Sequence, residues 1–459
     1  MNHKVIIEPF RIKTVEKIKM TTESERKELI DKAKYNTFLL SAEDVIIDLL
    51  TDSGTSAMSA DQWAGILKGD ESYAGARSWY KMKEAVQNMT GYEFILPTHQ
   101  GRAAEHLLYG RLGGKGKVFL SNTHFDTTRA NIEFSGAKAI DCPIPEGLIP
   151  DLDHPFKGNM DVRALEDNIL KYGKENIAAV ILTVTNNSGG GQPASLQNAK
   201  EVGDICKKYG ILYILDSCRV AENAYFIKQR EEQAKDMTYL EIAQKMFSYA
   251  DGTVMSAKKD ALVNMGGFLA LKDEKLFESL MTTLIITEGF ATYGGLSGRD
   301  MEAIAIGLKE VFEHDYLHYR ITSTTYLGER LKDMGVSVIS PIGGHAVYVD
   351  AKAFYPQIPV EQFPGQALAI ELYKMGGIRA VEIGSVMFGS KDENGNFVPA
   401  KMELVRMAIP RRVYTQSHID YVVEVFAELI KHKDKVKGYK IVWEPAFLRH
   451  FTAHFEPVG

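Results

Sequence analysis

The stretch NIAAVILTVTNNSGGGQPASLQNAKEVGDICKKYGILYILD, residues 176–216, contains two runs of apolar residues on either side of a helix-like segment. The first run begins at Ile177, and the second covers residues 211–216. Between them, residues 195–209 form a stretch with helical character. Unbroken β-branched runs that are separated by helices indicate parallel strands covered on both faces. This part of the chain therefore predicts an α/β fold with a mostly parallel sheet.

The same alternation continues on both sides of this stretch, from about residue 90 to residue 272. The further strand-like runs there are YEFILP, KVFLSN, DGTVMSA and GGFLAL. After residue 334, the shorter runs VSVIS, HAVYVD, IRAVEIG and ELVRMAI predict a second, partly antiparallel domain. We expect an N-terminal arm over residues 1–45 that is part of the small domain, a large domain over residues 46–310 and a small C-terminal domain over residues 311–459.

The bulk composition is that of an ordinary globular protein. The chain has 459 residues, of which 45% are hydrophobic and 25% charged, enough for two domains. Its net charge of −6 lacks the basic footprint of a nucleic-acid-binding protein. We find no apolar run long enough for a membrane span and no secretory signal. Three cysteines are too few and too odd in number for a disulfide framework, so we expect a reducing, cytoplasmic location.

Several polar residues follow the expected strands, where the ligands of parallel sheets bind. Asn187 follows one strand, Asp216 ends the next, and the adjacent Lys258 and Lys259 follow DGTVMSA. A lysine near another cation and away from water loses its proton more easily and becomes a nucleophile that can form Schiff bases. A strand-end aspartate can pair with the ring nitrogen of pyridoxal phosphate (PLP). The alternatives are a solvated lysine pair and an aspartate that caps a turn.

The segment PTHQGRAAEHLL, residues 97–108, predicts a strand, a tight turn and a helix. Free N–H groups and the helix dipole at such a helix start favour a phosphate. The residues at this position are Gln100, Gly101 and Arg102. Phe125 lies at another strand end, where an aromatic ring could stack on a flat cofactor, and Arg219 could contact the ring oxygen. A simple capping turn and ordinary core packing are the alternatives.

Short motifs along nearly the whole chain resemble the tryptophanase and tyrosine phenol-lyase family. The motifs are EPFRIK (8–13), IDLLTDSGT (47–55), GDESYAG (69–75), PTHQGR (97–102), GGQP (190–193), ENAYFIK (222–228), MSAKKD (255–260), YGGLSGRDMEA (293–303), GGHAV (343–347), IPRRVYT (409–415) and LRHFTA (448–453). The resemblance implies a PLP-dependent enzyme of fold type I, the aspartate-aminotransferase-like fold. It also implies a seven-stranded, mostly parallel sheet in the large domain and a smaller α+β domain.

The resemblance further implies the cofactors, the assembly and the cofactor-binding residues. PLP and a potassium ion would be the cofactors, and the protein would be a homotetramer, a dimer of dimers with shared active sites. Lys259 would form the aldimine, from which the reaction proceeds through a quinonoid and an aminoacrylate. The implied cofactor-binding residues are Gln100, Gly101, Arg102, Phe125, Asn187, Asp216, Arg219, Ser256, Lys258 and Lys259.

Other roles that the resemblance implies concern the substrate and the metal. Arg406 would hold the substrate carboxylate as a bidentate fork. The implied substrate contacts are Thr51, Ser53, Asn187, Ile383 and Arg406. Tyr73 would enter the site from a neighbouring subunit as a proton donor or phosphate contact. The potassium ligands would be Glu71 and the backbone carbonyls of Gly54 and Asn264.

Three positions distinguish the two branches of the family. Ile383 stands where the phenol-lyase pattern has an arginine, Asp126 where it has a threonine, and His450 where it has a phenylalanine. An indole N–H needs an acceptor, whereas a phenol hydroxyl favours a cationic donor. We therefore predict β-elimination of L-tryptophan to indole, pyruvate and ammonia, with the catalytic residues Lys259, Tyr73, Asp126 and His450. The alternatives are tyrosine phenol-lyase activity and a catalytically silent protein that binds PLP or an amino acid.

Overall fold

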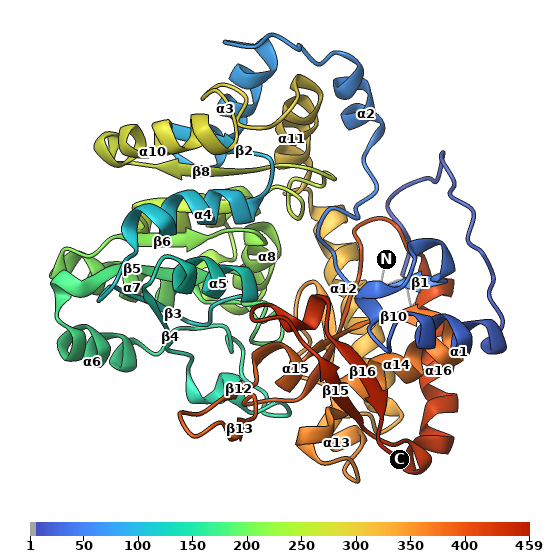
Figure 1. Ribbon diagram of the computed structural model, residues 1–459. Coiled ribbons are helices and arrows are strands. Elements are labelled where there is room, and N and C mark those ends of the chain that lie inside the picture. The colour runs from blue at the N-terminus through green and yellow to red at the C-terminus, as the bar shows by residue number, and fades with distance from the viewer. Residues whose placement is uncertain (1–5) are drawn as a thin grey trace. The chain divides into compact units, whose positions relative to one another are not determined.

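The computed structural model describes residues 6–459, and Figure 1 labels many of its helices and strands. Its contacts divide the chain into two compact units. Unit 1 comprises the residues up to Asp52, residues 148–153 and residues 319–459, and unit 2 comprises residues 53–147 and 154–318. The domain boundaries placed at 45/46 and 310/311 stay a prediction, and residues 1–5 of the expected arm lie outside the described residues.

Unit 2 is built on a seven-stranded sheet. Its strands are β2 (Phe94–Thr98), β3 (Val118–Ser121), β4 (Lys138–Asp141), β5 (Ile177–Thr183), β6 (Tyr213–Asp216), β7 (Gly252–Ser256) and β8 (Gly267–Leu271). They lie in the order β2-β8-β7-β6-β5-β3-β4. Strand β8 is antiparallel to both of its neighbours, and the other adjacent pairs are parallel. The predicted α/β fold with a mostly parallel sheet is confirmed.

Helices cover both faces of this sheet. Consecutive side chains of a strand point to opposite faces, yet Tyr213, Ile214 and Leu215 are all buried. Helices α4, α5 and α10 share one core with the strands. The helices of unit 2 are α2 (Ala60–Leu67), α3 (Arg77–Thr90), α4 (Gly101–Leu112), α5 (Asp126–Phe134), α6 (Val162–Tyr172), α7 (Leu196–Tyr209), α8 (Val220–Arg230), α9 (Tyr239–Tyr249), α10 (Glu274–Thr287) and α11 (Gly298–Glu310). Helix α12 (His314–Asp333) passes from unit 2 into unit 1.

The carboxyl ends of the parallel strands carry many of the predicted cofactor-binding residues. Strand β6 ends at Asp216, and β7 ends at Ser256, immediately before the lysine pair. Asn187 follows β5, and Phe125 follows β3. Because parallel strands present their carboxyl ends at the same edge, the fold gathers these side chains at one edge of the sheet.

Unit 1 contains small sheets and its own apolar core. Strands β9 (Ala346–Asp350), β11 (Val381–Ile383) and β14 (Leu404–Ala408) form an antiparallel sheet with β14 in the centre. The paired short strands are β1 (Ile47–Asp48) with β10 (Ile378–Arg379), β12 (Ser390–Lys391) with β13 (Phe397–Val398), and β15 (Tyr439–Trp443) with β16 (His454–Pro457). The helices are α1 (Glu23–Lys32), α13 (Ala351–Phe354), α14 (Pro364–Gly376), α15 (Ser385–Phe388) and α16 (Gln416–His432). The expected strand VSVIS is wrong, because it makes only an isolated bridge from Val338 to Val349.

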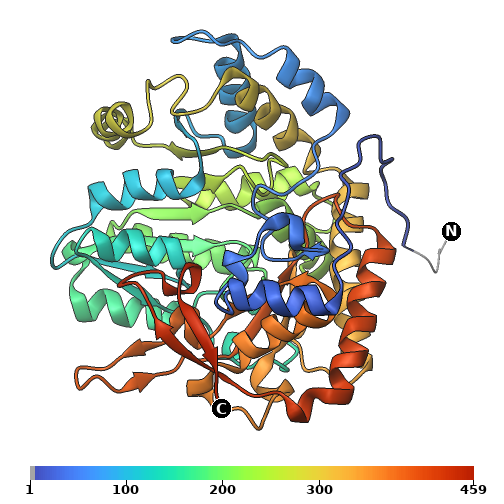
Figure 2. The ribbon, with the colours of Figure 1, turned by 45° about the vertical axis from the view of Figure 1, so that its right-hand side comes forward.

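The N-terminal segment packs on other elements of unit 1. Helix α1 begins with a capping box, in which the side chains of Thr22 and Glu25 satisfy backbone N–H groups. Arg26 of α1 donates from Nε to the carbonyl oxygen of Lys374 in α14, 2.9 Å away. Glu8 accepts from the backbone N–H of Gln416, so the N-terminal segment lies beside the start of α16 (Figure 2). Within residues 6–459, no helix is long and apolar enough to cross a membrane.

Candidate active site

The start of helix α4 lies directly against the end of strand β7. A Cβ atom on Gly101 would lie 2.6 Å from the Cβ of Ser256 and 3.0 Å from its backbone nitrogen. Gln100, which precedes the helix, forms a parallel bridge with Gly266. Only glycine allows this approach, which brings the free N–H groups of the α4 terminus to Ser256. The arrangement suits an anionic group such as a phosphate.

The two adjacent lysines have different surroundings. Lys258 is half-buried, and its pKa is lowered first by burial and then by the nearby charges of Lys259 and Arg102. Its Cε atom lies so close to Gly54 that a Cβ on that glycine would be 2.5 Å away. Lys259 instead interacts electrostatically with the buried carboxyl of Glu105. The positive charges of Lys258 and Arg102 therefore lie together, whereas Lys259 has an acidic neighbour.

Asp216, Asn187 and Arg219 lie at the ends of two neighbouring strands, β5 and β6. Asp216 is buried, and its Oδ1 accepts a hydrogen bond from the backbone N–H of Cys218 at 3.4 Å. Asn187 and Arg219 are also buried. The backbone N–H of Arg219 donates to the carbonyl of Val184 at 3.1 Å and so ties the loop after β6 to the loop after β5.

Helix α5 begins with the two residues predicted for the ring and the substrate. Phe125 occupies the N-cap position and is partly exposed. Asp126 is the first helical residue, and its Oδ1 accepts from the N–H of Thr127 at 2.6 Å. The preceding His124 is buried, with its Nδ1 2.7 Å from Oδ1 of Asp141. Phe125 is thus presented from a helix start that is fixed on both sides.

Glu105, which sequence reasoning missed, is buried beside these residues. Its carboxyl accepts from Oγ1 of Thr127 at 3.1 Å and from Oγ1 of Thr128. Burial and the charge of Asp216 raise the pKa of Glu105 to about 7. The available sequence signal was one charged residue between apolar positions of a predicted helix, which alone is too common to indicate a site.

The predicted potassium ligands are brought together only in part. Asn264 donates from Nδ2 to the backbone carbonyl of Gly54 at 3.0 Å, so these two residues are adjacent. Glu71 is instead paired with Arg299, whose Nε lies 3.0 Å from Oε1 of Glu71. Across the described residues, no group of three or more His, Cys, Asp or Glu side chains could hold a metal ion.

Two further predicted residues of unit 2 are Ser53 and Tyr73. Ser53 is partly buried and directly precedes Gly54. Tyr73 is 73% exposed. Its ring has two aromatic neighbours in the same unit, Phe290 at a centroid distance of 6.1 Å and Tyr293 at 5.3 Å. Tyr73 therefore lies on the surface of unit 2, with much of its ring open to a further contact.

The remaining predicted residues belong to unit 1 and also form one group. Arg406 lies in the central strand β14 and donates from Nη2 to the carbonyl of Leu50, next to Thr51, at 3.1 Å. Ile383, in the neighbouring strand β11, is buried in an apolar cluster to which Phe38 also belongs. The ring of His450 lies edge-on to Phe38 at a centroid distance of 5.8 Å.

A buried ion-pair network holds the segment that carries Thr51. Asp52 is 1% exposed and accepts from Nη1 of Arg411 at 2.9 Å. Nη2 of Arg320 lies 3.7 Å from the same carboxylate oxygen. Sequence reasoning missed this network, because its members are far apart along the chain.

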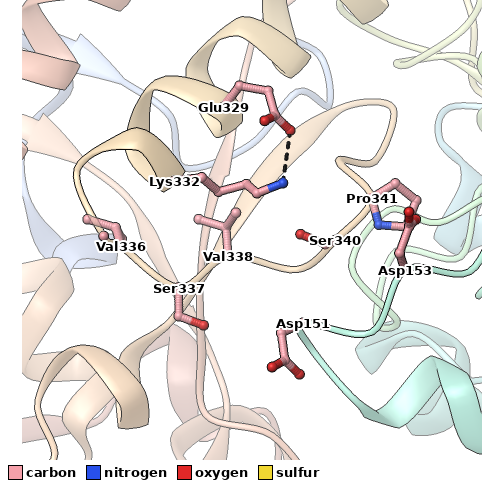
Figure 3. A pocket seen from close by; sticks show the side chains of 10 residues that line it. Asp151, Asp153, Glu329, Lys332, Val336, Ser337, Val338, Ser340 and Pro341 are labelled. Carbon is pink, nitrogen blue, oxygen red and sulfur yellow. Dashed lines mark hydrogen bonds and ion pairs between the residues drawn. The ribbon is translucent and has the colours of Figure 1, made fainter.

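A cavity of about 520 Å³ in unit 1 contains none of the predicted site residues. Figure 3 shows Asp151 and Asp153 among its lining side chains, with Glu329 and Lys332 across from them. Glu329 and Lys332 form an ion pair of 3.2 Å. The other lining residues are Gly335, Val336, Ser337, Val338, Ser340 and Pro341. This cavity is separate from the residues that the sequence analysis selected.

Comparison with known proteins identifies the family. A family model described as beta-eliminating lyase matches residues 48–425. The chain belongs to the β-eliminating lyase family. It is therefore an enzyme of the lyase class, and the family membership predicted from the motifs is confirmed.

Relatives within the β-eliminating lyase family cover nearly the whole chain. A tryptophanase from Salinibacter ruber is 57% identical over 98% of this chain and 96% of the relative. A tyrosine phenol-lyase from Pasteurella multocida is 48% identical over 98% of both chains. Among solved structures, serine palmitoyltransferase from S. paucimobilis has a TM-score of 0.59 at 15% identity and covers 90% of this chain and 97% of its own. That likeness concerns the fold and confirms the predicted fold type I.

Proposed function

We propose that this β-eliminating lyase cleaves L-tryptophan to indole, pyruvate and ammonia with PLP as its cofactor. The observation that carries the proposal is the gathering of Gly101, the lysine pair and Asp216 at one edge of the sheet. The chain is also 54–57% identical to three tryptophanases, against 48–49% for the tyrosine phenol-lyases.

The residues at this edge fit PLP. The α4 terminus and the cations Arg102 and Lys258 suit its phosphate. Asp216 suits the ring nitrogen, and the amine of Lys259 suits the aldehyde carbon. When bound, PLP supplies an electron sink for the carbanion that forms at the substrate Cα.

The side chains then have separate tasks. Lys259 would provide the amine that holds the cofactor and would act as the base toward the proton on the substrate Cα. Lys258 stays with the phosphate, because its Cε packs on Gly54 and its charge lies near Arg102. Arg406 offers a planar fork that binds the substrate carboxylate. Phe125 would cover the flat face of the ring, and Thr51, Ser53 and Asn187 would orient the substrate.

The choice of tryptophan rests on the residues that face the aromatic ring of the substrate. Ile383 lies in an apolar cluster, whereas the phenol-lyase pattern has an arginine there. Asp126 offers a carboxylate acceptor for the indole N–H. We propose that Asp126, His450 and Tyr73 transfer protons at the aromatic leaving group of the substrate.

Potassium binding and assembly complete the proposal. The backbone carbonyl of Asn264 lies close to Gly54, which supports carbonyl ligation of potassium there. Glu71 would be the third ligand once it leaves its ion pair with Arg299. The exposed ring of Tyr73 supports its contact with a second copy of the chain in a homotetramer. The cytoplasmic location stays a prediction.

The test is a comparison of two substrates. The purified protein with PLP should release indole from L-tryptophan faster than phenol from L-tyrosine, and more slowly when sodium replaces potassium. A Lys259→Ala variant should fold but lose turnover and the borohydride-stable bond to PLP. Dominant phenol release would favour tyrosine phenol-lyase activity, and PLP binding without turnover would indicate the silent protein.

A further inference from the structure

Glu105 connects two parts of the candidate active site. It lies in the first turns of α4, whose terminus approaches Ser256. Its carboxyl binds the hydroxyls of Thr127 and Thr128 in the first turn of α5, directly after Phe125 and Asp126. The side chain is buried and does not belong to the predicted site residues.

Glu105 is buried beside a second carboxyl, that of Asp216. The titratable groups that interact with it are Tyr109, Asp216 and Lys259. Cys218, a neighbour of Asp216, has a thiol whose pKa is raised by burial and by that carboxylate. Lys259 is the one cation in this set, and two carboxylates that share a buried region cannot both ionise at low cost.

The hydrogen-bond partners distinguish the two carboxyls. Asp216 accepts from the backbone N–H of Cys218, which can only donate and therefore offers no acceptor for a carboxyl proton. Glu105 contacts two threonine hydroxyls, and a hydroxyl can donate or accept. A protonated Glu105 therefore keeps both of its contacts by reversing one hydroxyl.

We propose that Glu105 is a positioning residue that carries a proton beside the ionised Asp216 and fixes the first turn of α5, which presents Phe125 and Asp126. The inference rests on the proposed function for the role of Asp216 toward PLP. It assigns to Glu105 two effects: Asp216 keeps its charge, and the ring-covering Phe125 keeps its place.

Glu105→Gln and Glu105→Ala separate these effects. Glutamine imitates a neutral carboxyl and keeps both threonine contacts, whereas alanine removes them. The dissociation constant of PLP, from absorbance titration of the apoprotein, should change by less than about threefold in Glu105→Gln and rise by about tenfold or more in Glu105→Ala. Glu133→Gln, on the exposed part of α5, is the matched control and should match the original protein.

The proton is tested by the pH dependence of the melting temperature. Because the folded-state pKa of Glu105, about 7, lies above the unfolded value of 4.5, its contribution to stability is lost as pH rises between these values. This loss should be present in the original protein and reduced in Glu105→Gln between roughly pH 4.5 and 7. The proposal would be overturned if the melting temperatures of the original protein and Glu105→Gln changed with pH by the same amount. It would also be overturned if Glu105→Gln bound PLP as weakly as Glu105→Ala. Neither readout uses tryptophan, so a failure of the tryptophan assay alone would count only against the proposed function.

Discussion

At the scale of single residues, unit 1 contains a network of buried charges around Asp52. The guanidinium of Arg411 is fully buried and pairs with Asp52, and Arg320 lies next to the same carboxylate. A buried ion pair costs desolvation, and its loss is costly when one partner is left behind. The network therefore fixes the backbone at Asp52, between the predicted substrate contacts Thr51 and Ser53.

Arg411→Met should destabilise the protein by about 3 kcal/mol or more, because Asp52 would keep its buried charge without the guanidinium that pairs with it at 2.9 Å. The shift of the urea midpoint measures this effect. Arg330→Met is the matched control: Arg330 is exposed on α12, and its loss should change stability by less than about 0.5 kcal/mol. Equal shifts for both variants would contradict a structural role for the network.

The lysine pair shows what a sequence can predict about single residues. Two adjacent lysines at a strand end were sufficient to predict that one of them has a lowered pKa. The structure assigns this lowered pKa to Lys258, because burial and Arg102 act on it. Arg102 is more than 150 positions away along the chain, so local sequence could not indicate which lysine is affected.

At the scale of elements, the contact between α4 and β7 carries the expected phosphate site. Gly101 lies directly against β7, and a Cβ there would collide with both the side chain and the backbone of Ser256. Gly110, in the same helix, would accept a Cβ with no atom within 4 Å. The two glycines therefore have opposite structural roles.

Gly101→Ala should push the start of α4 away from β7 and weaken PLP binding by about tenfold or more, since the amide donors would leave the phosphate. Gly110→Ala should leave PLP binding unchanged and stabilise the helix by about 0.5–1 kcal/mol. Titration with PLP and thermal melting check both variants. If Gly101→Ala binds PLP as tightly as the original protein, this helix terminus is not the phosphate site.

Helices and strands were predictable where apolar runs alternate with a helical pattern along the sequence. The runs ending at Thr183 and Asp216 are long, apolar and separated by a helix, and the positions of their carboxyl ends were sufficient to predict the edge where the site residues gather. The reversed direction of β8 and the isolated bridge at Val338 depend on pairing with distant segments. Strand pairing of this kind is set by tertiary contacts, which a local pattern does not contain.

At the scale of the whole molecule, buried carboxyls in both units influence how stability depends on pH. In unit 1, Glu382 accepts from the backbone N–H of Val386 at 2.9 Å, and Glu403 accepts from that of Ser385 at 3.2 Å. Burial and the neighbouring Glu403 raise the pKa of Glu382 to about 8, and burial also raises that of Glu403. Together with Glu105 in unit 2, these groups bind protons more tightly in the folded state.

The sign of the effect follows from this difference. Between the unfolded pKa of 4.5 and the folded pKa of about 8, Glu382 holds a proton in the folded chain that it releases on unfolding. Its contribution to stability is therefore fully present below pH 4.5 and is lost as pH rises toward 8, at a rate of up to about 1.4 kcal/mol per pH unit.

Glu382→Gln should remove this part of the pH dependence. Glutamine has one acceptor oxygen where the carboxyl has two, so the variant should be less stable than the original protein near pH 5, and the difference should shrink as the pH approaches 8. Urea midpoints measured across this range check the prediction, with Glu393→Gln on an exposed turn as the control. A constant difference at every pH would mean that Glu382 is ionised in the folded protein throughout, and that its contacts with α15 outweigh burial and the charge of Glu403.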